Sequence, residues 1–261
     1  MEIKVSYQLW VHSNTTIDGQ GVSLRIIGQP AVLERVRSVI LHNFEISGVP
    51  KYDSVHVFDG STSMVWIDHV TSGESEEGLI SVVQGSIDVT ISNCHLRNHN
   101  FNMLLGASDG DTVDKNTRVT VYRNFFVSSK QRVPHCRWGY CHVVNNYYKN
   151  WGFYALGGRV NAQIYCESNV FEPQTPKEVT PWFRGFNGDR TATIESHGDL
   201  LLNGAKFTWF NHTPLHHPDY VKDLYYPPSY PTNHLATMLQ NCAGVLGFKL
   251  NTCFRMARKW E

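Results

Sequence analysis

Two arginines lie five residues apart in the segment Gln131–Tyr140. Pro134, between them, fixes its own φ and has no backbone N–H, so an extended loop is expected here rather than a helix. Arg132 and Arg137 each offer a rigid fork of N–H donors that matches a carboxylate. The pair therefore predicts a binding site for a carboxylate-bearing ligand, although a solvated basic loop beside a strand would give the same pattern.

A second group of residues has the types needed to bind a hard cation. It consists of Asp53, Glu77, Phe101 and Arg132, at successive steps of 24, 24 and 31 residues. Ser81 follows Glu77 by four residues, an even spacing that places both side chains on one face of an extended segment. Two carboxylates beside a hydroxyl suit Ca²⁺, with water and an anionic ligand completing the shell. A solvated acidic edge is the alternative interpretation.

These groups can meet only if the fold stacks residues one repeat apart, and the chain contains such a repeat. Short runs of alternating apolar and polar residues recur and end in Asn or His. Their central apolar residues lie 26, 24, 30, 22 and 23 residues apart. An unequal period in this range indicates stacked β-rich units. The central residues are Leu41, Ile67, Ile91, Val121, Val143 and Cys166.

The repeat predicts an all-β fold, a right-handed single-stranded parallel β-helix (a β-solenoid) with one coil per repeat. The repeat region lacks long stretches of helical periodicity, which disfavours a leucine-rich horseshoe, and a propeller blade would need about 40 residues. Asn side chains at equivalent turns can satisfy backbone groups of neighbouring coils. We expect this ladder to comprise Asn43, Asn93, Asn124, Asn146 and Asn169.

A single domain is expected over residues 1–261. Coils are predicted at about 14–171 and 195–210, followed by a tail at about 211–261 that packs along the coils and closes the C-terminal end. The chain starts at about the first coil and has no apolar leader. We therefore expect that an N-terminal cap and a signal peptide are missing from it.

Composition narrows the possible functions. Charged residues make up 18% of the chain and sum to a net charge of zero, which does not favour nucleic-acid binding. No apolar run approaches the length of a membrane span. The cysteines form no C-x-x-C pair, so a structural zinc site is not expected. A metal site in the Pro-rich loop that holds His212, His216 and His217 is also disfavoured.

The remaining cysteine and glycosylation signals depend on the cellular compartment. Cys242 and Cys253 could pair in an oxidising compartment. Asn14 and Asn211 begin glycosylation sequons that matter only if the chain is exported. Three cysteines in strand-like runs are expected to be buried free thiols. They are Cys94, Cys141 and Cys166.

Several segments, taken together and in this order, resemble polysaccharide lyase family one, in particular plant pectate lyases and the related pollen allergens. They are Val65–His69, Glu77–Ser81, Met103–Gly106 with Ser108 and Asp109, and Arg132–Arg137. The similarity extends from about Asn14 to Cys253. The resemblance implies Ca²⁺-dependent β-elimination of de-esterified homogalacturonan on a parallel β-helix. Asp68 and His69, within the first segment, are interpreted as structural residues beneath the site.

The resemblance also implies roles for the residues of the arginine loop. Arg132 matches the arginine that removes the proton at C5 of a galacturonate. Arginine is normally cationic in proteins, so bound Ca²⁺ is expected to help by making the neighbouring C–H more acidic. Arg137 matches the arginine that clamps a substrate carboxylate. Lys130 and His135, beside these arginines, are further candidate substrate-binding residues.

The metal positions depart from the family pattern. Asp53 and Glu77 match two calcium-binding carboxylates, and Ser81, also a candidate metal ligand, stands where the family usually has an aspartate. Lys51 replaces an acidic residue found in many members, and Phe101 replaces a lysine that usually contacts substrate. All three departures imply weaker binding of metal and substrate.

The first functional hypothesis is a pectate lyase of reduced activity, expected to be a monomer that binds pectin and neither nucleic acid nor membrane. In its full-length form it would be a glycoprotein secreted to the plant cell wall. The alternative is a non-catalytic, wall-associated protein that binds pectin on the same scaffold. A polygalacturonase-type hydrolase would need a cluster of aspartates for acid and base catalysis, and the chain has no Asp-Asp pair.

Overall fold

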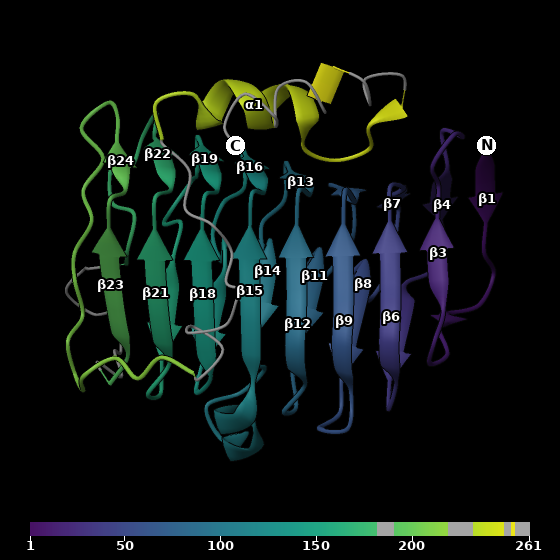
Figure 1. Ribbon diagram of the computed structural model, residues 1–261, viewed down its shortest axis with the longest axis horizontal. Coiled ribbons are helices and arrows are strands. Elements are labelled where there is room, and N and C mark those ends of the chain that lie inside the picture. The colour runs from purple at the N-terminus through teal and green to yellow at the C-terminus, as the bar shows by residue number, and fades with distance from the viewer. Residues whose placement is uncertain (182–190, 219–231, 248–251, 254–261) are drawn as a thin grey trace.

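The computed structural model describes residues 1–181, 191–218, 232–247 and 252–253. Within these ranges the chain winds through three parallel sheets that run side by side along its long axis (Figure 1). Every named strand pair is parallel, and each strand pairs with its counterpart in the next coil. The predicted parallel β-helix is confirmed.

From β1 to β22 the strands fall to the three sheets in strict rotation. Sheet A contains β1 (Glu2–Lys4), β4 (Arg25–Ile27), β7 (Glu45–Ser47), β10 (Thr71–Ser72), β13 (His95–Arg97), β16 (Phe125–Val127), β19 (Tyr147–Lys149), β22 (Val170–Glu172) and β24 (Leu200–Leu201). Sheet B contains β2 (Leu9–Trp10), β5 (Ala31–Glu34), β8 (Val55–Phe58), β11 (Ile80–Val82), β14 (Met103–Leu105), β17 (His135–Arg137) and β20 (Gly157–Arg159). Sheet C contains β3 (Thr16–Asp18), β6 (Arg37–His42), β9 (Ser63–Asp68), β12 (Ile87–Ser92), β15 (Arg118–Tyr122), β18 (Tyr140–Val144), β21 (Gln163–Glu167) and β23 (Thr193–His197). The first strand begins at Glu2, so strands occur before the expected start of the coils near residue 14.

Inward-facing side chains stack into columns because successive coils pair in register. Leu41, Ile67 and Ile91 pair in sequence across sheet C, and all three are completely buried. The same column continues through Val121, Val143 and Cys166. Strand residues alternate between the two faces of a sheet, so the period-two pattern of the sequence sends one set inward and leaves the other outside.

A buried polar ladder crosses the later coils. The backbone N–H of Asn124 donates to Asn146 Oδ1 at 2.9 Å, and the N–H of Asn146 donates to Asn169 Oδ1 at 2.9 Å. The N–H of Asn169 extends this ladder by donating to Asp199 Oδ1. Burial raises the pKa of the Asp199 carboxyl to about 6. The ladder prediction is therefore confirmed for the three asparagines.

The ladder prediction was wrong for Asn43 and Asn93. Both take the corner position immediately before the ladder, with φ of 57° and 50°, a conformation that Asn tolerates better than most residues. Phe44 and Cys94 occupy the ladder position in those coils. Asn93 instead donates to Asp68 Oδ1 at 2.8 Å, and Asn43 Oδ1 accepts from the Leu246 N–H at 2.9 Å.

The described part of the C-terminal segment after residue 231 packs against the coils. Helix α1 (Leu235–Cys242) runs across the edge formed by sheet A (Figure 1). Its Leu235, Met238 and Leu239 bury against Phe125 and Tyr147. Beyond the helix, Val245 N–H donates to Thr71 Oγ1 at 3.0 Å. The aromatic residues that cover the last coil, Phe207 and Phe210, precede the expected boundary at residue 211.

The cysteines comprise one disulfide, which the sequence left open, and the buried free thiols that the sequence predicted. Cys242 and Cys253 form a disulfide. Cys94, Cys141 and Cys166 are free and buried, as is Cys136.

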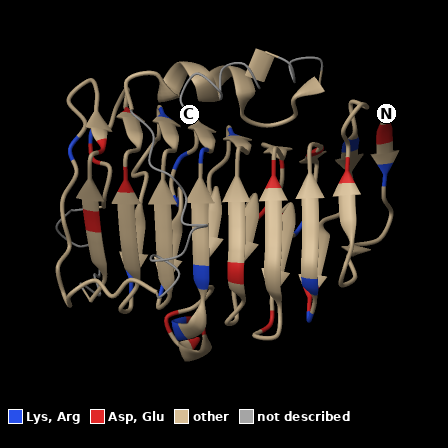
Figure 2. Cartoon of the chain, in the orientation of Figure 1, with Lys and Arg blue, Asp and Glu red and all other residues tan. Residues whose placement is uncertain are grey.

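The remaining features concern the surface. The short 3₁₀ helix η1 (Thr112–Asn116) precedes β15. Charges of both signs are interspersed over the face that sheet C presents, without a run of one sign (Figure 2). Among the helices of the described ranges, none has both the length and the apolar character required for a membrane span.

Asn146→Ala is expected to lower the free energy of unfolding by about 3 kcal/mol. The change removes the acceptor for two Asn124 donors and the donor to Val121 O, which leaves buried polar groups unpaired. Urea denaturation measures the effect. Asn116→Ala, at an exposed position, is the matched control and is expected to change stability little. Equal effects of the two substitutions would contradict the ladder's contribution.

Candidate functional site

A groove of about 550 Å³ runs along the outer face of sheet B. Asp53, Glu77, Phe101 and Arg132 all line it. The structure thus brings together the four residues that the coil spacing placed in one column. They meet because β8, β11 and β14 pair in register, so the loops that precede these strands stack as well.

Asp53 is held close to the floor of the groove. Its Oδ1 packs so closely against Gly78 that a Cβ atom on residue 78 would clash with it. Asp53 Oδ2 is 3.4 Å from His56 Nδ1, and the Asp53 side chain is 18% exposed. Glu77 is exposed at the rim of the same groove. The two carboxylates are therefore both accessible to a cation, one from the floor and one from the edge.

Ser81 does not present its hydroxyl to the groove. Its residue is completely buried, and its Oγ lies 2.5 Å from His56 Nδ1. The sequence analysis missed His56, although the coil period could have found it, because His56 precedes Ser81 by 25 residues and pairs with it in the sheet. The expected third metal ligand is consequently a hydrogen-bond partner of a histidine.

The donor set fits a hard divalent cation in part. Asp53 and Glu77 offer the carboxylate oxygens that Ca²⁺ prefers. Ser81 does not fit as a third ligand, because His56 takes its hydroxyl. Lys51 is exposed on the same rim, and its backbone N–H donates to Glu76 Oε2 at 3.0 Å. Any cation here would therefore depend on two protein carboxylates and on the ligand's own oxygens.

Arg132 places its guanidinium over an aromatic ring. Its guanidinium carbon is 4.0 Å from the centre of the Phe101 ring, a cation–π arrangement. Arg132 has φ of 58°, and the peptide bond that follows Val133 is cis. The expected loop thus ends at Pro134, and His135–Arg137 form strand β17 rather than more loop.

Arg137 is bound from two sides. Its Nε donates to Asp109 Oδ1 at 2.8 Å and its Nη1 to Gly106 O at 3.0 Å. Arg159, which the sequence analysis did not single out, binds the same carboxylate through Nη2 at 2.5 Å. Hydrogen bonds from Arg159 hold the pKa of Asp109 below its ordinary value; partial burial opposes this, and Arg137 adds to it. Two guanidinium groups therefore converge on one half-buried carboxylate.

His135 and Lys130 differ in accessibility. His135 is 3% exposed, and its Nδ1 lies 3.0 Å from the Tyr154 hydroxyl. Burial lowers the pKa of His135 to about 3, and the charges of Arg137 and Arg132 add to this effect, so the ring is neutral. Lys130 is exposed and packs against Gly152. Lys130 is thus open to solvent but does not line the groove, whereas His135 is placed to position Tyr154.

The sequence model of a family described as "Pectate lyase" matches residues 2–246. The chain is 37% identical over 248 residues to "Probable pectate lyase 22" of Arabidopsis thaliana, covering 85% of this chain and 57% of the relative. It is 34% identical over 283 residues to "Probable pectate lyase P59" of Solanum lycopersicum, covering 95% of this chain and 60% of the relative. The chain thus spans less than two thirds of the length of these curated relatives.

Among solved structures, the chain resembles jun a 1, the major allergen from cedar pollen. The TM-score is 0.84 at 31% sequence identity, covering 94% of this chain and 78% of the allergen. A thermostable pectate lyase, PL 47, matches with a TM-score of 0.73 at 24% identity, covering 91% of this chain and 69% of that chain. The second match supports the fold alone.

Asp109→Asn is expected to destabilise the protein by about 1 kcal/mol, because Arg137 and Arg159 lose the charge between them and repel each other. Thermal unfolding at low ionic strength measures the effect, and added salt should reduce it. Asp88→Asn is the matched control, because in the described contacts the exposed Asp88 pairs only with Arg118, at 3.1 Å. A larger loss in the control would contradict the proposed convergence.

Proposed function

This chain belongs to the pectate lyase family, and we propose that it cleaves the (1→4)-α-D-galacturonan of pectate by Ca²⁺-dependent β-elimination in the groove over sheet B. The observation that carries the proposal is the meeting of Arg132 with Asp53 and Glu77 in one groove. The guanidinium can bind the carboxylate of an anionic sugar, and the two carboxylates can bind a cation.

Arg132 is the proposed base. In β-elimination the proton leaves C5 of a galacturonate, its electrons form the C4–C5 double bond, and the bond from C4 to the glycosidic oxygen breaks. The departing chain then gains a proton on that oxygen. Arg132 is the candidate for the first transfer because it lines the groove, where the Phe101 ring lies 4.0 Å from its guanidinium carbon.

Arg137 is the proposed clamp for a substrate carboxylate. Two of its nitrogens already bind Asp109 and Gly106, so Nη2 is the nitrogen left to reach the sugar. Asp109 and Arg159 would hold that nitrogen in a fixed direction. Lys130 is a further candidate contact because it is exposed, and we assign His135 a positioning role through Tyr154.

Asp53 and Glu77 would hold the calcium ion, together with substrate carboxylates and water. When bound, the ion would neutralise the carboxylate next to C5 and make the C–H bond more acidic. We propose that activity is reduced relative to a site with more acidic ligands. The support is that the Ser81 hydroxyl is engaged by His56 and that Lys51 brings a positive charge to the same rim.

The alternative function is a pectin-binding protein without catalysis. The stacking of Arg132 on Phe101 favours it, because a guanidinium held over an apolar ring is stabilised as a cation. A cationic arginine would attract galacturonate carboxylates whether or not it removes a proton. The two functions therefore share a ligand and differ only in product formation.

We further propose that the full-length protein is secreted to the plant cell wall and acts as a monomer. The disulfide between Cys242 and Cys253 supports an oxidising compartment. Asn14 and Asn211 are both exposed, as glycosylation would require. The relatives from Arabidopsis thaliana and Solanum lycopersicum support a plant context.

The first test measures product formation from polygalacturonate with and without millimolar Ca²⁺. The readout is the absorbance of the unsaturated product. The chain is expected to be active with Ca²⁺, and Arg132→Lys is expected to lose at least about 100-fold in rate because the base is changed. Arg118→Lys, on the far face in sheet C, is the control and should keep its rate. A folded wild-type chain that forms no product at any Ca²⁺ concentration, yet binds pectate, would establish the alternative.

The second test concerns the third metal position. Ser81→Asp alone is expected to change little, because His56 Nδ1 would bind the new carboxylate. Combining it with His56→Ser should free that carboxylate and lower the Ca²⁺ concentration for half-maximal activity about tenfold. His56→Ser alone is the control. If the double variant requires as much Ca²⁺ as the wild type, the metal does not lie beside Ser81.

A further inference from the structure

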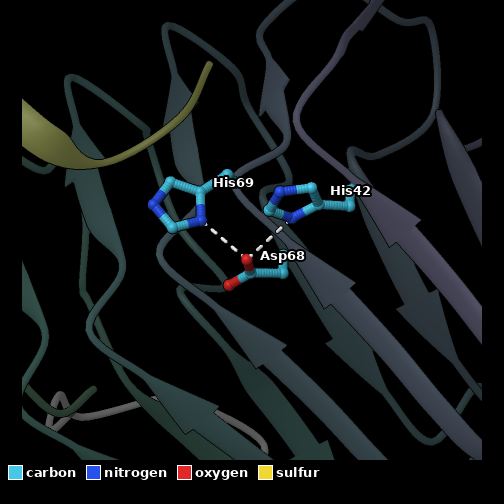
Figure 3. Close-up of side chains that lie close together, drawn as sticks. All are labelled: His42, Asp68 and His69. Carbon is cyan, nitrogen blue, oxygen red and sulfur yellow. Dashed lines mark hydrogen bonds and ion pairs between the residues drawn. The ribbon is translucent and has the colours of Figure 1, made fainter. Parts of the chain in front are cut away.

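A second group of metal-ligating side chains lies away from the groove. His42 ends β6, Asp68 ends β9, and His69 follows at the corner that leads to sheet A (Figure 3). The Nδ1 atoms of His42 and His69 lie 2.9 Å and 2.6 Å from the same atom, Asp68 Oδ2. One ligand atom from each residue falls within 4.8 Å of the others. No residue of this group lines the groove over sheet B.

The backbone explains why the three side chains converge. His42 and Asp68 pair across adjacent coils, so they point outward one above the other. Consecutive strand residues normally point to opposite faces. His69 does not continue the strand, because its φ of 51° turns the chain and brings its ring to the same side as Asp68. The group is therefore fixed by the coil register and by one left-handed corner residue.

The surroundings hold the carboxylate in one orientation. Asp68 Oδ1 accepts from Ser92 Oγ at 2.6 Å and from Asn93 Nδ2 at 2.8 Å. Ser92 is in turn fixed by the Trp66 indole N–H at 2.8 Å. These donors occupy Oδ1 and leave Oδ2 to the two imidazoles. Outer hydrogen bonds that orient a ligating carboxylate are a usual feature of protein metal sites.

Solvent reaches the two histidines of the group more readily than the aspartate. The side chains of His42 and His69 are 25% and 17% exposed, whereas the Asp68 side chain is 4% exposed. The segment after α1 lies close by, because Leu246 N–H donates to Asn43, the neighbour of His42. A cation could therefore approach from the histidine side and be screened from solvent on the carboxylate side.

We propose that His42, Asp68 and His69 form a binding site for a borderline divalent transition metal such as Zn²⁺. The ligands are Nδ1 of each imidazole and Oδ2 of the carboxylate, with water in the fourth position. Two imidazoles and one carboxylate suit Zn²⁺ and not Ca²⁺, which prefers oxygen ligands. A metal bound at Nδ1 leaves Nε2 as the ring nitrogen that carries the proton.

Metal binding at this place would tie two coils together. The ion would link the ends of β6 and β9, which are already joined by backbone pairing and by the hydrogen bond between His42 Nδ1 and Asp68 Oδ2. A ligand that binds only the folded chain raises the free energy of unfolding. The site would thus stabilise the folded β-helix and would not take part in catalysis in the groove.

Titration of the metal-stripped full chain with ZnCl₂ by calorimetry tests the proposal. One ion per chain is expected, with a rise in Tm, and CaCl₂ should not displace it. His42→Gln and His69→Asn should each weaken Zn²⁺ binding about 10- to 100-fold, by analogy with losses at other metal-site residues. Asn suits position 69 because it tolerates positive φ. His12→Ala, at an exposed histidine outside the group, is the matched control.

Unchanged Zn²⁺ affinity in both variants, or no binding by the folded wild type, would overturn the proposal. Should either variant fail to fold, zinc X-ray absorption on the wild-type chain decides instead. Two imidazole nitrogens in the first coordination sphere are expected, and an all-oxygen sphere would refute the assignment. None of these measurements depends on lyase activity, so failure of the zinc site and failure of the proposed catalysis are distinguishable.

Discussion

The register between successive parallel coils is the constraint on which the rest of the structure depends. Backbone hydrogen bonds place each strand residue directly above its counterpart in the neighbouring coil, as Val39, Val65 and Val89 show. A shift of one residue in any coil would exchange its inner and outer side chains. The apolar columns, the asparagine ladder and the groove are all consequences of this one alignment.

The corners of the coils redirect the chain from one sheet to the next, so that each coil surrounds the core. A single residue with positive φ separates sheet C from sheet A in coil after coil, including Asn43, His69, Asn93 and Asn145. The next residue then faces inward, where it must be apolar or fully hydrogen bonded. Asn146 meets that demand by bonding both neighbouring coils. The same corner geometry brings His69 beside Asp68, so a folding device also creates a possible metal site.

The proposed site combines features that favour catalysis with features that oppose it. Arg137 is oriented by Asp109 and Arg159, which is the kind of pre-organisation that binding of an anionic sugar requires. In contrast, Ser81 is engaged by His56, so the metal position retains two carboxylates. Of the two arginines, Arg132 lines the same groove as the carboxylates Asp53 and Glu77, whereas Arg137 lies outside its lining.

The sequence by itself determined the parallel β-helix, because a period-two pattern repeated every coil can bury its apolar residues in few other ways. It also placed Asp53, Glu77, Phe101 and Arg132 in one column. Only the tertiary structure decided which asparagines form the ladder, because a one-residue difference at a corner is invisible in the repeat. Contacts such as Ser81 with His56, and Asp109 with Arg159, join residues 25 and 50 positions apart through side-chain orientation. Such orientation depends on packing between coils, which the spacing of residues does not specify.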